Sequence, residues 1–201
     1  MISASVVPKD GRAARSYRAR LALADALLDL LNEGVERPTA AQIAERAGVS
    51  LRLVFHHFED LEAIYASAGD LQIERVRTLN KPVDPALPFE GRVAAFLKIR
   101  ARVFEYVSPV RRASIRRETS SPEISRRMRV ARQLAREHTL HAFAGEIAST
   151  PAGQRAEVAA ALDSVTSWEM WEYLRSPSEL SVRQASRIVE RMVRALLIGG
   201  T

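Results

Sequence analysis

The chain has 201 residues, of which 47% are hydrophobic and 27% are charged, and it contains no Cys. The missing cysteines exclude disulfide bonds, thiolate metal ligands and a cysteine nucleophile. No apolar run approaches the roughly 18 residues of a membrane span, and residues 1–20 lack a signal-peptide core. We therefore expect a cytoplasmic globular protein of one or two domains that neither spans nor binds a membrane.

Apolar residues recur at spacings of three and four along the chain, whereas strand-like alternation and Asn-Gly turns are missing. This pattern predicts an all-α fold of about nine helices. The first helix is expected from about residue 12 to residue 32. We expect a basic arm at its start, because up to residue 24 only Asp10 opposes the basic residues. These are Lys9, Arg12, Arg15, Arg18 and Arg20.

Residues 39–58 spell two short helices joined by a tight turn. Thr39 and Gln42 form a T-x-x-Q capping box, which fixes the start of the first helix. Gly48 supplies the left-handed conformation that ends this helix, and Ser50 is a good N-cap for the next one. The pair has the outline of a helix-turn-helix, which indicates DNA binding.

The next helix is expected from Asp60 to about Leu79, and residues 81–88 then contain three prolines. Prolines at this density end a helix and mark a domain boundary. We therefore expect a helix-turn-helix domain over residues 1–80 and a second helical domain over residues 81–201.

In the second domain, an apolar stripe predicts a fifth helix over about 93–107. Ser108-Pro109 is expected to end it, because a proline inside a helix removes a hydrogen bond, and a sixth helix follows over 109–120.

Hydroxyl residues placed before prolines predict the later helices. Two such pairs predict long helices over 122–148 and 151–175, since proline is favourable at the first helical position. The last helix is expected to start at a capping box from Ser181 to Gln184 and to carry an apolar stripe to Leu197.

Two segments carry a family resemblance. Residues 43–50 read Ile-Ala-Glu-Arg-Ala-Gly-Val-Ser, and Phe55-His56-His57-Phe58 follows them in the second helix of the pair. With these segments the chain resembles the tetracycline-repressor (TetR) family of bacterial transcriptional regulators, most strongly over residues 15–65. The resemblance implies a homodimer with an N-terminal three-helix reading domain, a helical ligand-binding and dimerisation domain, and release of DNA when ligand binds. Phe55 stands where the family usually has Tyr, and Leu61 stands where it usually has Lys. These two departures put two expected contacts with the DNA backbone in doubt.

The expected DNA contacts lie in the helix-turn-helix and at the start of the first helix. Arg52 stands where a small residue is common, and an arginine there can donate two hydrogen bonds to guanine; a salt bridge to Glu45 or a phosphate contact are the alternatives. Leu53 is expected against a thymine methyl group. His56 and His57 can both donate to phosphates, and the alternative is that one of them packs against the first helix. Adjacent residues point about 100° apart on a helix, so we expect one histidine to face outward and one inward, with His56 as the DNA contact. The candidates are Arg15, Thr39, Ser50, Leu51, Arg52, Leu53, Phe55, His56 and His57.

Polar residues interrupt three apolar stripes in the second domain. Arg100, His138 and Glu169 thereby face inward among aromatic residues, a composition typical of a small-molecule pocket. The alternative is that Arg100 and Glu169 pair with each other or lie at the dimer seam. No metal or cofactor is expected, since His138 and His141 have no further ligand nearby in sequence. The candidate pocket residues are Phe96, Arg100, Phe104, Met128, His138, Trp168 and Glu169.

The sequence therefore predicts a ligand-responsive repressor that binds a palindromic site in double-stranded DNA as a homodimer. Apolar surface on the last two helices predicts a four-helix seam between the copies. An enzyme is not expected, because the sequence has no nucleophile-base pair, Gly-rich phosphate loop or metal-ligand spacing. The alternative is an architectural or partner-binding helix-turn-helix protein, in which the ten excess positive charges of residues 92–136 bind an anionic surface; solvated helix faces also explain such a run.

Overall fold

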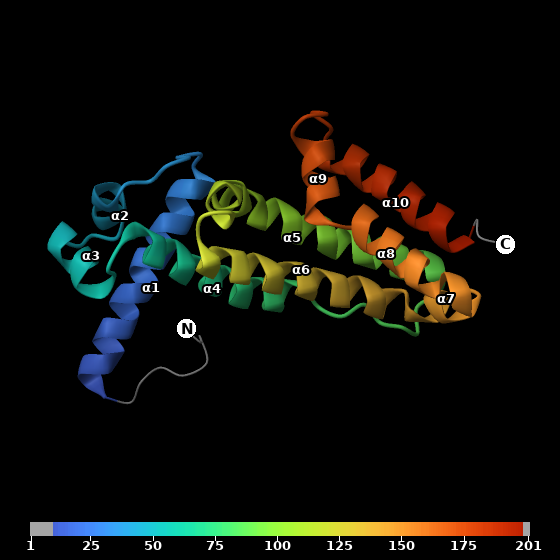
Figure 1. Cartoon of the computed structure of the whole chain (residues 1–201), viewed down its shortest axis with the longest axis horizontal. Coiled ribbons are helices and arrows are strands. Elements are labelled where there is room, and N and C mark those ends of the chain that lie inside the picture. The colour runs from blue at the N-terminus through green and yellow to red at the C-terminus, as the bar shows by residue number, and fades with distance from the viewer. Residues whose placement is uncertain (1–9, 199–201) are drawn as a thin grey trace. The chain divides into compact units, whose positions relative to one another are not determined.

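The described chain is built from helices alone. The computed structural model describes residues 10–198, whose helices Figure 1 shows in chain order. These residues form ten α-helices and one short 3-10 helix, with no strand among them, which confirms the all-α fold. No helix within this range is both long and apolar enough to cross a membrane. The helices are α1 (Gly11–Asn32), α2 (Ala40–Arg46), α3 (Leu51–His57), α4 (Leu61–Leu79), α5 (Phe89–Glu118), α6 (Pro122–Ala142), α7 (Ala144–Ser149), η1 (Ala152–Gln154), α8 (Arg155–Val165), α9 (Trp168–Arg175) and α10 (Val182–Ile198).

The chain folds into two compact units. The first contains residues 10–78 together with 107–129, and the second contains 79–106 together with 130–198. Helices α5 and α6 therefore each contribute one segment to each unit. The functional division of the chain near residue 80 stays a prediction.

The apolar stripe of α1 forms the centre of the first unit's core. Leu23 and Leu27 are fully buried in one cluster with Ile43 of α2, Val54 of α3 and Ile64 of α4. Burying a large apolar side chain contributes about 1.5–3 kcal/mol. This shared core holds the two short helices α2 and α3 to α1 (Figure 1).

Local hydrogen bonds and one glycine set the ends of α2 and α3. The Gln42 N–H donates to the Thr39 hydroxyl at 3.3 Å, and the Thr39 N–H donates to Gln42 Oε1 at 2.9 Å, which confirms the predicted capping box. The Ser50 hydroxyl accepts from the Leu53 N–H at 3.2 Å. Gly48 has a φ of +68°, where a residue with a Cβ is strained, so this glycine fixes the short turn between the helices.

Pro109 lies inside a helix, so the predicted break at this residue is wrong. Helix α5 runs without interruption from Phe89 to Glu118. A proline inside a helix costs about 3 kcal/mol. Phe104 and Val110 on either side of it are buried, and burial of such side chains outweighs that cost.

The helix predicted over 122–148 is two helices, α6 and α7. Phe143 stands between them with φ −119° and ψ 22°, outside the helical region, and its side chain is fully buried. The helix therefore ends where this aromatic ring is buried, and the apolar pattern of the sequence does not reveal this end.

The helix predicted over 151–175 is also divided, into η1, α8 and α9. Ser167 begins α9 by accepting a hydrogen bond from the Met170 N–H at 3.1 Å. At the next junction the Gln184 N–H lies 3.3 Å from the Ser181 hydroxyl, which confirms the capping box at the start of α10.

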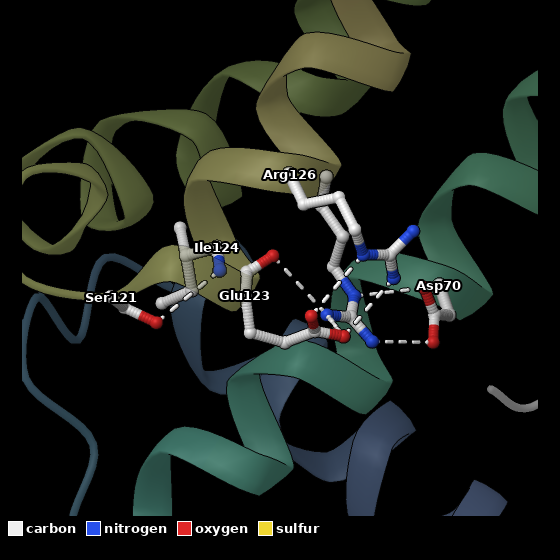
Figure 2. A network of polar contacts seen from close by, with 6 residues as sticks. Asp70, Ser121, Glu123, Ile124 and Arg126 are labelled. Carbon is white, nitrogen blue, oxygen red and sulfur yellow. Dashed lines mark hydrogen bonds and ion pairs between the residues drawn. The ribbon is translucent and has the colours of Figure 1, made fainter.

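An ion-pair network joins α4 to α6 within the first unit. The guanidinium group of Arg127 donates to both carboxylate oxygens of Asp70, at 2.8 Å and 2.7 Å, and also contacts Glu123. In Figure 2 the carboxylates of Asp70 and Glu123 lie on opposite sides of the guanidinium group between them. A Cβ on Gly69 would lie 3.1 Å from Arg127 Cδ, so the glycine leaves room for the arginine side chain.

Candidate DNA-binding surface and buried polar cluster

Helix α3 is anchored by one face and exposed on the other. Val54 is fully buried and Phe58, which caps the helix, is 3% exposed. On the opposite face, Leu51 is 44% exposed, Phe55 is 56% exposed and Arg52 is also exposed. Exposing large apolar side chains to water is unfavourable, so their exposure beside an arginine indicates a surface that meets a partner.

Arg52 makes no ion pair with Glu45 among residues 10–198, which removes the salt-bridge alternative. The arginine of α2 that does form a pair is Arg46, which donates to both carboxylate oxygens of Glu33, at 2.7 Å and 2.5 Å. Arg52 therefore presents its guanidinium group to solvent from the first turn of α3.

The two histidines of α3 point in different directions, as predicted. His56 is exposed, whereas His57 is half-buried and its Nδ1 lies 3.4 Å from the hydroxyl of Ser16 in α1. Burial, and then the neighbouring His56 and Arg20, lower the pKa of His57 below its ordinary value. His56 is thus the histidine that solvent and a partner can reach, and His57 packs on α1.

The basic arm divides into exposed and packed arginines. Arg12, Arg15 and Arg18 are exposed at the start of α1. Arg20 instead lies with its guanidinium carbon 4.6 Å from the centre of the Phe58 ring, a cation–π contact that the charge pattern did not indicate. Lys9, the remaining basic residue of this stretch, lies outside the described residues.

The helix N-caps use their hydroxyl groups inside the fold. The Thr39 hydroxyl donates its proton to Gln42 Oε1 at 3.0 Å, so it has no proton left for a phosphate. The predicted contact of Thr39 with DNA therefore depends on the backbone N–H groups beside it. Ser50 differs, because its oxygen accepts from the Leu53 N–H and its own hydroxyl proton is still available to donate. Leu53 is half-buried, which leaves Leu51 and Phe55 as the apolar groups that α3 exposes most.

In the second unit, Arg100 of α5 is the centre of a buried polar cluster. Its Nη2 group donates to the carbonyl oxygen of Ala135 at 3.0 Å and to the hydroxyl of Thr139 at 2.8 Å, both on α6. The Thr139 hydroxyl in turn lies 3.0 Å from that of Thr166, which donates to the Leu162 carbonyl at 2.7 Å. The sequence analysis did not identify the two threonines, because a threonine at a stripe position stands out less than a charged residue does.

His138 belongs to the same cluster in its neutral form. Its Nε2 lies 3.0 Å from the carbonyl oxygen of Lys81, which can only accept, so Nε2 carries the proton. The unprotonated Nδ1 then faces Arg100 Nη2 at 3.4 Å as an acceptor. Burial and the neighbouring Arg100 lower the pKa of His138 to about 4, against which the Lys81 carbonyl acts only partly.

Aromatic rings surround Arg100 as predicted, but the pocket candidates Met128 and Glu169 lie elsewhere. The guanidinium carbon is 4.7 Å from the centre of the Phe96 ring and 5.2 Å from that of Phe104. Met128 is in the first unit, where its sulfur accepts from Arg111 at 3.4 Å.

Glu169 lies at the surface, and its expected inward orientation is wrong. Its side chain is 52% exposed and 3.9 Å from Arg132, whereas Arg100 is buried, so the pair considered between Glu169 and Arg100 does not form. Trp168 is buried, as expected for a packing residue. The glutamate follows an apolar stripe in sequence, but α8 ends before it and α9 begins with a new direction.

Part of the excess positive charge of residues 92–136 is neutralised by ion pairs or buried within the fold. Arg92 pairs with Glu146, Arg127 with Asp70, and Arg136 with Asp163. Arg100 and Arg111 are buried. These contacts leave a smaller exposed charge than the sequence suggests, which weakens the anionic-surface alternative.

Solved structures share this fold, although no protein-family model and no curated protein sequence match the chain. A transcriptional regulator of Rhodococcus sp. Rha1 matches with a TM-score of 0.69 at 21% identity, over 90% of this chain and 96% of its own. A protein of Mesorhizobium loti MAFF303099, described as a TetR-family transcriptional regulator, has a TM-score of 0.63 at 19% identity, with coverages of 93% and 99%. The chain has the TetR-regulator fold.

A third similar structure is that of NalD of Pseudomonas aeruginosa, the secondary repressor of the MexAB-OprM multidrug efflux pump. It matches with a TM-score of 0.59 at 20% identity, over 91% of this chain and 98% of its own. At such identities the likeness establishes the fold, and the roles of single residues rest on the geometry of this chain.

Proposed function

We propose that this protein is a DNA-binding transcriptional regulator that inserts α3 into the major groove. The observation that carries the proposal is the two-sided construction of α3. Val54 fastens the helix to the core, while Leu51, Arg52, Phe55 and His56 fall on the opposite arc of the helix and are exposed. The structures with the same fold, which are described as transcriptional regulators, support this proposal.

The exposed side chains suggest how bases are read. The Arg52 guanidinium group suits the O6 and N7 acceptors of guanine, a pairing worth about 1–3 kcal/mol of discrimination between bases. Leu51 and Phe55 present apolar surface that suits thymine methyl groups. Arg12 and Arg15, exposed at the start of α1, suit phosphate oxygens, which fix orientation without reading sequence.

The protein acts as a homodimer in this proposal. Helix α10 buries Val189 and Val193 within the second unit but leaves Ile188 and Met192 half-exposed and Ile198 56% exposed. Pairing α8 and α10 with the same helices of a second copy buries this remaining apolar surface in a four-helix seam. Two copies of α3 then reach successive major grooves about 34–36 Å apart, so the operator is a palindrome.

A small-molecule effector regulates DNA binding, with the polar cluster of the second unit as its site. Arg100 and His138 are buried there among Phe96 and Phe104, a composition common in ligand sites. Repression is the favoured outcome, supported by the description of NalD as a repressor. An effector produces this response only if it binds the free and DNA-bound forms with unequal affinity.

Base reading by Arg52 is tested by comparing two arginine variants on a panel of duplexes. Arg52→Ala should reduce the preference at one base pair in each half-site, by about tenfold, since that contact specifies a base. Arg15→Ala should weaken binding to all duplexes alike and reduce its salt dependence. Equal losses on every duplex for both variants contradict the role of Arg52 in reading sequence.

The dimer is tested by sedimentation velocity of the protein without DNA. We expect a dimer for the native chain and a shift to monomer for Met192→Arg, which places a charge on the half-exposed face of α10. A native protein that sediments as a monomer at micromolar concentration contradicts the two-fold arrangement.

A further inference from the structure

Arg100 is a buried cation that no acidic side chain contacts within the part of the chain that the structure describes. Only 3% of its surface is exposed, and the side chains that contact it are Phe96, Phe104, His138 and Thr139, none of which carries a negative charge. Arginine is almost never buried without an acidic partner, because removing the charge from water is costly.

The nearest acidic influence on Arg100 comes from a carboxylate that already has a partner. Asp163 acts on Arg100 through its charge alone. It lies 2.9 Å from Arg136, with which it forms an ion pair. Burial lowers the pKa of Arg100 to about 10, so the guanidinium group remains ionised at neutral pH.

The hydrogen bonds of Arg100 are also incomplete. A guanidinium group has five N–H donors. Three acceptors cluster around Nη2, namely the Ala135 carbonyl, the Thr139 hydroxyl and His138 Nδ1, whereas the buried Nε has no acceptor among residues 10–198. A buried donor without an acceptor is unfavourable because it has lost its hydrogen bond to water, so this site is more stable with an acceptor at Nε.

We propose that Arg100 is the anchor of a binding site for a small organic carboxylate. The carboxylate accepts from the Nε side of the guanidinium group, and its organic part lies against the rings of Phe96 and Phe104. This inference rests on the proposed function in one respect, because it names the chemical class of the effector.

A carboxylate fits the local charge better than a phosphate does. It carries one negative charge and has a planar pair of oxygens that matches the guanidinium geometry. A phosphate brings close to a second charge at neutral pH. Within residues 10–198 no second cation contacts Arg100 to balance it, because its neighbouring side chains are Phe96, Phe104, neutral His138 and Thr139.

The proposal also links binding to the helices that extend beyond the site. Arg100 belongs to α5, and its acceptors Ala135 and Thr139 belong to α6. A carboxylate at Nε binds the same guanidinium group that donates from Nη2 to these α6 acceptors, so binding acts directly on the link between α5 and α6. Both helices continue into the first unit, so a change in these hydrogen bonds can alter the segments that α5 and α6 contribute to it.

The test is thermal unfolding of the full-length protein, without DNA, in the presence of three carboxylates and their primary amides. The probes are benzoate, phenylacetate and octanoate, each compared with its amide at equal concentration. At least one carboxylate should raise the Tm and its amide should not, because a ligand that binds the native state stabilises it and only the carboxylate can neutralise Arg100. If no carboxylate exceeds its amide, or if inorganic phosphate stabilises as well as the best carboxylate, the proposal is overturned.

Variants of two arginines on α5 locate the effect. Arg100→Met should weaken binding of the stabilising carboxylate about tenfold or more, whereas Arg100→Lys should weaken it less because the charge remains. Arg102→Met, two residues further along and exposed, is the control and should leave binding unchanged. If Arg100→Met binds the carboxylate as tightly as the native protein and Arg102→Met do, the proposed site is overturned. If Arg100→Met does not fold, Arg100→Lys and the comparison of carboxylate with amide still test the proposal.

Failure of this site and failure of the proposed function give different results. A carboxylate that binds at Arg100 in a protein that selects no duplex supports the site and contradicts the regulator. Selection of a palindromic duplex without any carboxylate binding supports the regulator and overturns the site.

Discussion

Replacing Asp70 by Asn breaks the ion pair that joins α4 to α6 in the first unit while keeping the size of the side chain. The pair is well shielded, since the Arg127 side chain is 6% exposed and that of Asp70 is 16% exposed. Asn can still accept one hydrogen bond from Arg127, but its NH2 group then faces the second donor of the guanidinium group.

The expected cost follows from this geometry. Removing one partner of a fully buried pair costs about 3–5 kcal/mol. Arg127 keeps its contact with Glu123, and one hydrogen bond survives, so we expect Asp70→Asn to lower the free energy of unfolding by about 2–3 kcal/mol. Urea unfolding followed by circular dichroism measures this difference.

Glu123→Gln is the matched control on the same network (Figure 2). The Glu123 side chain is 50% exposed, so water screens its pairs with Arg126 and Arg127 and the change should cost less than about 1 kcal/mol. Equal costs for the two variants, or a cost below about 1 kcal/mol for Asp70→Asn, refute the reasoning that burial sets the strength of this link.

Three further predictions concern a turn, a buried histidine and a helix cap. Gly48→Ala should lower the free energy of unfolding by about 1–2 kcal/mol because of the positive φ, whereas Gly145→Ala, in open space within α7, should be neutral or stabilising; both are measured by urea unfolding. The pKa of His138 is about 4 in the folded protein and about 6.5 in the unfolded chain. As the pH falls from 6.5 to 4, the unfolded chain therefore takes up a proton that the folded protein does not, and the free energy of unfolding falls by up to about 3 kcal/mol. Unfolding curves of His138→Gln should show a smaller loss there than native curves, and an unchanged slope contradicts neutral burial. Thr39→Ala should cost about 1 kcal/mol in the same assay through loss of the α2 cap, and no change contradicts the capping role.

The ends of α2 and α3 were predictable because their signals are local. Thr39, Gly48 and Ser50 each act on backbone groups within a few residues, so the sequence contains all the information that sets these ends. The outward direction of His56 followed in the same way from helical periodicity alone.

The helix breaks of the second half were not predictable from local signals. Pro109 is a strong local breaker, yet α5 continues through it because residues on both sides are buried. Phe143 shows the opposite effect, since no breaker marks the position where α6 ends. Both outcomes depend on packing between elements, which overrides local preference.

The polar cluster shows the same limit at the level of a site. An interrupted apolar stripe correctly indicated that Arg100 and His138 face inward. It gave no means of telling which helix each side chain meets, so Thr139 was missed and Met128 was grouped with residues of the other unit. Periodicity describes one helix, whereas a site is made by several.

Selection of duplexes from a random pool, followed by footprinting of the selected sequence, tests the central claim most directly. We expect a palindromic site under about 20 base pairs, with half-sites centred about one helical turn apart, because two copies of α3 must reach successive major grooves. Uniform affinity for all duplexes, governed by salt concentration alone, would contradict sequence-specific regulation by this protein.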